Sequence, residues 1–126
     1  KYSKIILMKP DKFIISYFKN FSKKNPNLTA SFYANNSKLV DKENENLFKK
    51  NEEKIVYFKS LYFALSLKGY KKTNLKSFRS FKIKKNTFIV ETKAERIFRK
   101  KKKQILHCYY LIVKAKKFFI TFASCI

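Results

Sequence analysis

The side chains that could do chemistry in this sequence are mainly cations, and they concentrate in its second half. The segment 93–104 holds Arg96, Arg99 and four consecutive lysines. The five adjacent cations from Arg99 to Lys103 repel one another and will not bury, so we expect a basic RNA-binding loop at 93–104 between two strands. A loop of this kind can displace condensed counterions from a phosphate backbone, which is the main source of nucleic-acid affinity. The segment predicts binding to a polyanion, with a merely solubilising charge run as the alternative.

A second set of cations precedes this loop and is interleaved with Phe78 and Phe81. Aromatic rings beside cations can stack on unpaired bases, and each stacked base contributes about 1–3 kcal/mol. The same two rings could instead face the core while the cations face solvent, and the sequence leaves both interpretations open. The candidate RNA-binding residues are Lys71, Lys72, Lys76, Arg79, Lys82, Lys84, Lys85, Lys93, Arg96, Arg99, Lys100, Lys101, Lys102 and Lys103.

Other reactive side chains are few. Cys108, Cys125 and His107 are too few for a four-ligand zinc site, and two cysteines near one end do not indicate a disulfide framework. His107 and Cys108 are neighbours in an apolar strand, so their side chains point to opposite faces and cannot form a nucleophile pair. Gly69 is the single glycine, which excludes a glycine-rich phosphate loop. We expect no catalytic residues, no metal site and no cofactor.

The acidic residues are better explained as helix caps and surface pairs than as a catalytic site. Glu52 and Glu53 stand in the expected first turn of a helix, where the helix dipole favours negative charge. Glu43 and Glu45 belong to an acidic stretch that we expect to be a solvated loop over residues 35–52.

Composition points in the same direction as the basic segments. The 126 residues carry 31 Lys+Arg against 8 Asp+Glu, a formal net charge of +23, while 45% hydrophobic residues exclude a purely disordered tail. The abundance of Lys, Asn, Ile and Phe over Gly, Ala, Arg and Pro indicates an AT-rich coding genome, such as that of a protist organelle. No presequence is visible, so we expect an organelle-encoded protein of the mitochondrion, folded as one domain over residues 1–126.

Two helices are well marked. Pro10-Asp11 is a helix start, the apolar residues up to Phe21 follow at helical spacing, and Asn25-Pro26 ends the segment. The second helix runs from Asn51, as its cap, to Lys68, and Gly69 supplies the stop. A short strand at 5–8 precedes the first helix.

The remaining apolar segments read as strands. We expect one at 28–34, broken by Asn35-Asn36-Ser37, and another at 81–84 that turns at Asn86. Three further strands are expected at 87–91, 105–113 and 118–123. The fold class predicted is α+β, with two amphipathic helices packed on a small mixed or antiparallel sheet.

A membrane-spanning interpretation of the C-terminal region is unfavourable. Residues 105–126 have the length of a bilayer span, but Lys114, Lys116 and Lys117 fall in the middle, where each would cost several kcal/mol. We expect two strands there and no transmembrane segment.

Taken as a whole, the basic, Phe/Tyr-rich chain resembles a ribosomal protein from an AT-rich protist organelle. More narrowly, Phe88-Ile89-Val90, the basic run 96–103 and Gln104-Ile105-Leu106 are similar to the strand–loop–strand of small-subunit ribosomal protein ten, with the helix 53–68 before it. That family is ferredoxin-like, and its basic hairpin reaches into rRNA. A second register, using the strand at 5–8 and the helix from Asp11, fits about as well.

The resemblance implies a non-enzymatic, structural constituent of a mitochondrial ribosome, in the small subunit, with rRNA and neighbouring ribosomal proteins as partners. One alternative is a nucleic-acid-processing accessory protein or nuclease, for which Glu91 and Glu95 are the only acids in the basic half. Another is a basic peripheral subunit of a respiratory membrane complex.

Overall fold

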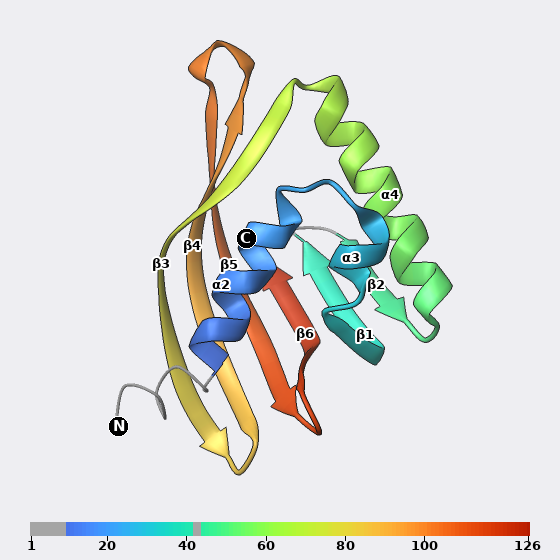
Figure 1. Cartoon of the computed structure of the whole chain (residues 1–126), viewed down its shortest axis with the longest axis vertical. Coiled ribbons are helices and arrows are strands. Elements are labelled where there is room, and N and C mark those ends of the chain that lie inside the picture. Colours follow the sequence, from blue (N-terminus) through green and yellow to red (C-terminus); the bar gives the residue numbers. More distant parts are fainter. Residues whose placement is uncertain (1–9, 42–43) are drawn as a thin grey trace.

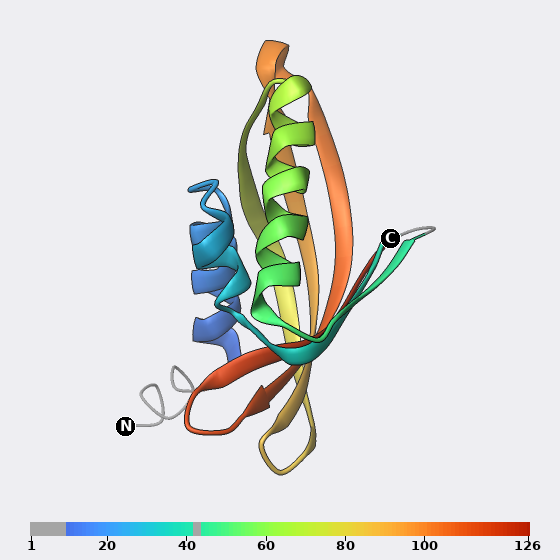
Figure 2. The same cartoon turned by 90° about the vertical axis from the view of Figure 1, so that its right-hand side faces the viewer.

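The computed structural model describes residues 10–41 and 44–126, and it contains one curved sheet with helices on one side (Figures 1 and 2). The strand order is β2-β1-β6-β5-β4-β3, with β1 parallel to β6 and every other neighbouring pair antiparallel. The elements are α2 (Pro10–Phe21), α3 (Pro26–Ala30), β1 (Tyr33–Asp41), β2 (Asn44–Phe48), α4 (Asn51–Leu67), β3 (Tyr70–Lys84), β4 (Thr87–Phe98), the 3₁₀ turn η1 (Arg99–Lys101), β5 (Lys103–Lys114) and β6 (Phe118–Cys125).

The helix expected from Pro10 is confirmed as α2. Its apolar residues Ile14, Tyr17, Phe18 and Phe21 recur at intervals of three and four, and all are buried against the sheet. This spacing places them on one face of the helix, so burying that face stabilises α2 where it lies.

The second expected helix is confirmed as α4, although its cap differs from the expectation. Lys50, not Asn51, is the capping residue, and Glu53 Oε1 accepts hydrogen bonds from the backbone N–H groups of Lys49 and Lys50 at 2.7 and 2.9 Å. These bonds satisfy two backbone donors that precede the first helical hydrogen bond. At the other end Gly69 has φ +82°, the left-handed conformation that glycine adopts without strain.

The first half of the sheet differs from the prediction. Asn25-Pro26 opens the short helix α3, so the strand expected at 28–34 begins only at Tyr33. The expected break at 35–37 lies inside β1, and the expected acidic loop at 35–52 contains most of β1 and all of β2. β1 pairs with the distant β6 and β2 pairs with β1, and this pairing overrides the low strand propensity of asparagine. The strand expected at 5–8 lies outside the described residues.

The expected basic loop at 93–104 is wrong in its extent. β4 continues to Phe98 and β5 starts at Lys103, so only the turn around η1 leaves the ladder. The two strands form a long hairpin that projects beyond the rest of the sheet at one end (Figure 1). Lysine side chains can extend from a β-strand into solvent without disturbing the backbone hydrogen bonds between strands. A run of charged residues therefore does not predict a loop by itself.

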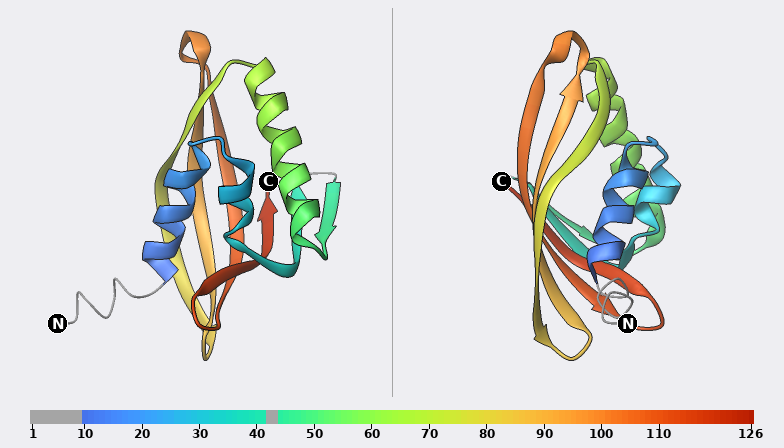
Figure 3. Two further views of the ribbon diagram at one scale, coloured as in Figure 1. Left: turned by 45° about the vertical axis from the view of Figure 1, so that its right-hand side comes forward. Right: turned by 60° about the vertical axis from the view of Figure 1, so that its left-hand side comes forward.

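The predicted fold class is corrected by these elements. A six-stranded mixed sheet carries three helices in the described part of the chain, so the fold is not a ferredoxin-like sheet with two helices. The concave face of the sheet holds the core together with α2, α3 and α4, while the opposite face carries no helix (Figure 3).

Candidate functional site

A cavity of about 460 Å³ lies between the helices and the concave face of the sheet. Aromatic rings from α2, β1, α4 and β5 make up much of its wall, and polar groups enter from the strands. The polar side chains in its wall include Tyr17, Tyr33, Tyr57, Tyr110, Asp41 and Arg96. A concave, mainly apolar cavity with a few placed polar groups is the common form of a small-molecule site.

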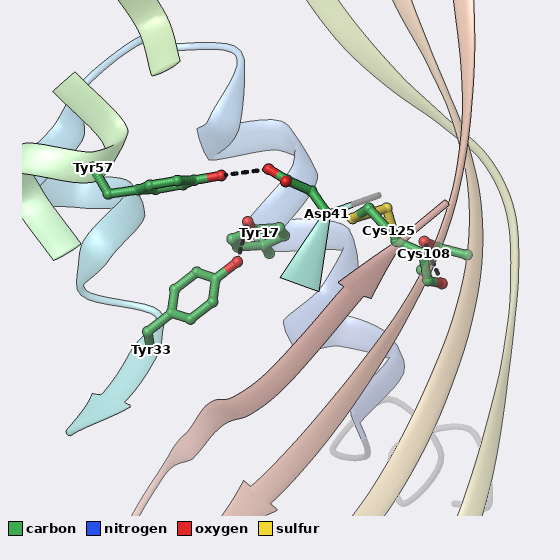
Figure 4. Close-up of a disulfide and its surroundings, with 7 residues drawn as sticks. Tyr17, Tyr33, Asp41, Tyr57, Cys108 and Cys125 are labelled. Atoms are coloured by element: carbon green, nitrogen blue, oxygen red, sulfur yellow. Dashed lines mark hydrogen bonds between the residues drawn. A yellow bond between two sulfur atoms is a disulfide. The ribbon is translucent and has the colours of Figure 1, made fainter. Parts of the chain in front are cut away.

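Two phenols form a buried hydrogen-bonded pair in this wall. The hydroxyl of Tyr17 on α2 lies 2.7 Å from that of Tyr33 on β1, and both residues are buried (Figure 4). Burial raises the pKa of Tyr17 well above its ordinary value, and the neighbouring Tyr33 raises it further. Both phenols therefore stay neutral at physiological pH, as hydrogen-bonding groups without charge.

The carboxylate of Asp41 reaches the cavity from the end of β1. Its Oδ2 accepts a hydrogen bond of 3.1 Å from the Tyr57 hydroxyl of α4 (Figure 4). Burial, followed by the negative charge of Asp41, raises the pKa of Tyr57. The bond ties α4 to β1 across the cavity, so it fixes one wall relative to the other.

Arg96 is the cation in the wall of the cavity. It lies on β4 opposite Gln104 of β5, and both side chains line the cavity. The Nε atom of Arg96 is buried without a hydrogen-bond partner, and Arg96 forms no salt bridge within residues 10–41 and 44–126. Burial raises the pKa of Tyr110, and the positive charge of Arg96 partly offsets that rise. The guanidinium charge thus lowers the pKa of a cavity phenol, while Arg96 itself has no salt-bridge partner among the described residues.

A single disulfide joins two residues of the cavity wall, although two cysteines near one end of the sequence did not indicate a disulfide framework. Cys108 of β5 and Cys125 of β6 are direct cross-strand partners with Cα atoms 4.1 Å apart (Figure 4). The backbone carbonyl of Cys108 also accepts a hydrogen bond from Thr92 Oγ1 at 3.1 Å. The β5–β6 hairpin brings together two cysteines that are 17 positions apart, and their spacing alone could not reveal this register.

The predicted RNA-binding residues are spread along β3, β4, β5 and the two turns that join them. Arg79 pairs with Glu91 at 2.8 Å, and Lys103 lies 3.9 Å from Glu95. Those two acids, considered for a nuclease, therefore face cations on the side of the sheet away from the cavity. The structure brings only Arg96 of the predicted set into the cavity wall. Among the described residues, no group of three or more His, Cys, Asp or Glu side chains is arranged to hold a metal ion.

The two rings left open by the sequence, Phe78 and Phe81, have different surroundings. Phe78 is half-buried and packs against the core, whereas Phe81 is exposed on the outer face of β3.

Within the part of the chain that the structure describes, no helix is long and apolar enough to cross a membrane.

The role of Arg96 was missed because it was counted with the surrounding cations. Strand alternation from Phe88 and Val90 through Ala94 places residue 96 on the same, inward face. Extending that alternation past residue 91 would have separated Arg96 from Lys93, which faces outward. The cavity phenols carried no comparable signal, since an aromatic on a helix face is ordinarily core.

No protein-family model matches the sequence, and no curated protein matches it. Solved structures match in fold. An NTF2-like protein with a cystatin-like fold from Novosphingobium aromaticivorans has a TM-score of 0.75 at 5% identity, over 98% of this chain and 85% of its own. An NTF2-like protein of unknown function from Shewanella oneidensis has 0.74 at 12% identity, over 93% and 98%. The yeast UBP3-associated protein Bre5 has 0.73 at 14% identity, over 91% and 90%.

At these identities the comparisons establish the fold alone, which is NTF2-like and cystatin-like. They overturn the expectation of a ribosomal protein, because the similar structures are NTF2-like domains and a protein associated with UBP3. The basic composition misled the sequence interpretation, since a high net charge reports on solubility and partners and does not specify a fold.

Proposed function

We propose that this domain binds a small organic anion with an apolar, aromatic body in the cavity, without chemical turnover. The observation that carries the proposal is the buried Nε of Arg96, which has no hydrogen-bond partner in a wall of phenols, apolar side chains and a few other polar groups, among them the Asp41 carboxylate.

The charge of the ligand follows from Arg96. Arg96 is half-buried and has no salt-bridge partner among the described residues, and a ligand oxyanion would supply one. The guanidinium presents its N–H donors in a planar fork that matches a carboxylate or sulfonate. Asp41 is not the counter-ion of Arg96, because its carboxylate accepts a hydrogen bond from the Tyr57 hydroxyl and makes no salt bridge to Arg96.

The body of the ligand follows from the rest of the wall. Phe18, Phe21 and Phe58 supply apolar aromatic surface, and the Tyr17 and Tyr110 rings lie with centroids 5.5 Å apart. Aromatic rings favour edge-to-face or offset contacts with another ring. The volume of about 460 Å³ lies within the usual range for small-molecule sites.

The test uses two probes that differ only in charge. 1-Anilinonaphthalene-8-sulfonate carries a sulfonate, and N-phenyl-1-naphthylamine has the same aromatic rings without it; both fluoresce in apolar surroundings. We expect Arg96→Met to weaken the anionic probe by about 10- to 100-fold, the range of a charge-assisted hydrogen bond, and to leave the neutral probe nearly unchanged. Arg96→Lys should give an intermediate loss, because it keeps the charge and loses the fork.

Arg79→Gln is the matched control, because it removes an arginine charge from the outer surface. It should change the binding of either probe by less than about twofold. Equal losses in Arg96→Met and Arg79→Gln would mean that the sulfonate responds to net charge, and the proposal would be wrong. Circular dichroism of each variant establishes that it is folded.

A further inference from the structure

The face of α4 that points away from the sheet carries exposed apolar side chains. Val56, Phe63 and Leu67 are 62%, 68% and 74% exposed. They follow one another at helical spacing, on the side of the helix opposite the buried Phe58 and Leu65. The outward face of a surface helix is ordinarily charged or polar, so these three side chains need a partner. We call them the apolar stripe.

The stripe ends beside a dense group of cations. The carbonyl of Gly69, just after α4, accepts a hydrogen bond of 3.0 Å from the Arg99 N–H, where the β4–β5 turn begins. The turn therefore lies at the C-terminal end of α4, and two perpendicular views show it projecting beyond that end (Figures 1 and 2). We call the exposed cations gathered there the basic end; they are Lys68, Lys71, Lys72, Arg99, Lys100, Lys101 and Lys102. None of them forms a salt bridge among the described residues.

We propose that the apolar stripe and the basic end together dock this domain on the surface of an anionic lipid bilayer. Such binding draws on two contributions, the apolar area that enters the interface and the attraction of cations to anionic headgroups. Phe63 and Leu67 supply the first, and the lysines of the turn supply the second. The inference is independent of the ligand-binding function, because neither Phe63 nor Leu67 lines the cavity.

Charge sets the orientation of α4 on such a surface. Its first turn carries Glu52 and Glu53, whereas its last turn leads into the basic end. A negatively charged surface therefore attracts the C-terminal end of α4 and repels the N-terminal end. Leu67 and Phe63 lie nearest the attracted end, so they enter the interface ahead of Val56.

The shape of the surface favours a bilayer over other anionic occupants. The stripe is the outward side of a helix, and the turn is the tip of a projecting hairpin (Figure 2). A fluid bilayer adapts to such convex parts, whereas a peptide is usually held in a groove or at a sheet edge. A nucleic acid would pair with the cations and leave the apolar stripe in water. A bilayer takes up both parts at once.

The test is cosedimentation of the folded protein with lipid vesicles. We expect binding to vesicles of phosphatidylcholine with about one-third phosphatidylserine, little binding to phosphatidylcholine alone, and weaker binding as salt is raised. Replacing Lys100, Lys101 and Lys102 together with glutamine should weaken the binding by about 100-fold, which is about fivefold for each lysine. Leu67→Ser, which changes no charge, should weaken it by about 5- to 10-fold.

Each variant has a matched control. Replacing Lys82, Lys84 and Lys85 with glutamine removes the same charge from the β3–β4 end, opposite the basic end (Figure 1). Ile15→Ser removes an aliphatic side chain that is 48% exposed on α2. Each control should weaken binding by less than about threefold, because the removed groups lie away from the bilayer.

Three results would overturn the proposal. Equal losses from the two lysine triples would show that the vesicles respond to net charge alone. A loss from the Lys100–Lys102 triple without a loss from Leu67→Ser would indicate a polyanion site in place of a bilayer site. Equal binding to neutral and anionic vesicles would remove the role of the cations. Circular dichroism of each variant establishes that it is folded.

Discussion

Breaking the Cys108–Cys125 disulfide should destabilise the fold by a measurable and calculable amount. The bond joins the middle of β5 to the last residue of β6. Beside it, the Ile126 N–H donates to the His107 carbonyl at 2.8 Å. Reduction therefore leaves the end of β6 held by backbone hydrogen bonds and by the packing of buried Cys108 alone.

The magnitude follows from the length of chain that the bond closes. A crosslink between residues 17 positions apart lowers the entropy of the unfolded chain by an amount worth about 3 kcal/mol at 25 °C. For a chain of 126 residues this corresponds to a fall in melting temperature of roughly 10 °C. The loss is a large share of the roughly 5–15 kcal/mol that stabilises ordinary domains.

The assay is guanidinium unfolding of the oxidised and reduced wild type, followed by circular dichroism. Cys108→Ala combined with Cys125→Ala is the control, and its midpoint should not respond to reductant. We expect the reduced wild type to unfold at a lower midpoint with about 3 kcal/mol less stability. A difference below about 1 kcal/mol, or an equal effect of reductant on the double variant, would refute the entropy argument.

Two further predictions concern buried polar groups. The tyrosines of the unfolded chain lose their protons near pH 10, whereas burial raises the pKa of each buried phenol in the folded protein. The folded state is therefore favoured below pH 10, and this stability is lost as the pH rises above 10 because only the unfolded chain can ionise. At pH 11 the loss is about 1.4 kcal/mol for each of the three fully buried phenols, Tyr17, Tyr33 and Tyr110. The pKa values of Tyr62 and Tyr70 are raised in the same direction, so absorbance at 295 nm should show the buried tyrosines titrating together with unfolding. Independent titration of all tyrosines in a folded chain would contradict this. Lys54 is buried, and its Nζ donates hydrogen bonds to the backbone carbonyls of Tyr33 and Ala34 at 3.0 and 3.2 Å. Lys54→Met should therefore lower the free energy of unfolding by about 1–3 kcal/mol in thermal unfolding, whereas Lys59→Met on the exposed side of α4 should lower it by less than about 0.5 kcal/mol. Equal losses in the two variants would contradict the role of the two hydrogen bonds.

The helices α2 and α4 could be predicted because their signals are local. Apolar spacing, the proline start of α2 and the Gly69 stop of α4 all lie within or beside each helix. The first turn of α4 shows the limit, because the interacting side chain was Glu53 and the capping residue was Lys50. Local patterns predict that a helix forms and leave its terminal hydrogen bonds open.

The sheet could be predicted only where a strand pairs with its neighbour in sequence. The turn at Asn86 and the strand segments on both sides of it were expected, whereas the bounds of β1 were wrong, because its partner β6 lies some 80 positions later. Cys125 pairs with Asp41 in that parallel ladder and with Cys108 on its other side. The disulfide and the cavity carboxylate thus depend on one long-range register that no local pattern contains.

The two faces of β4 show how one charged segment can serve two purposes. Glu95 and Arg96 are adjacent in sequence, yet the strand turns Glu95 outward to Lys103 and Arg96 inward to the cavity. Composition counts both as part of a basic run, but only the inward residue lacks a counter-ion. Because alternate residues lie on opposite faces, a substitution at Arg96 and one at Glu95 change opposite sides of the same strand without changing its backbone partners. The cavity can therefore be tested by Arg96→Met without changing the outer face of β4, and loss of the Glu95–Lys103 pair in that variant would mean that the β4 pairing itself was lost.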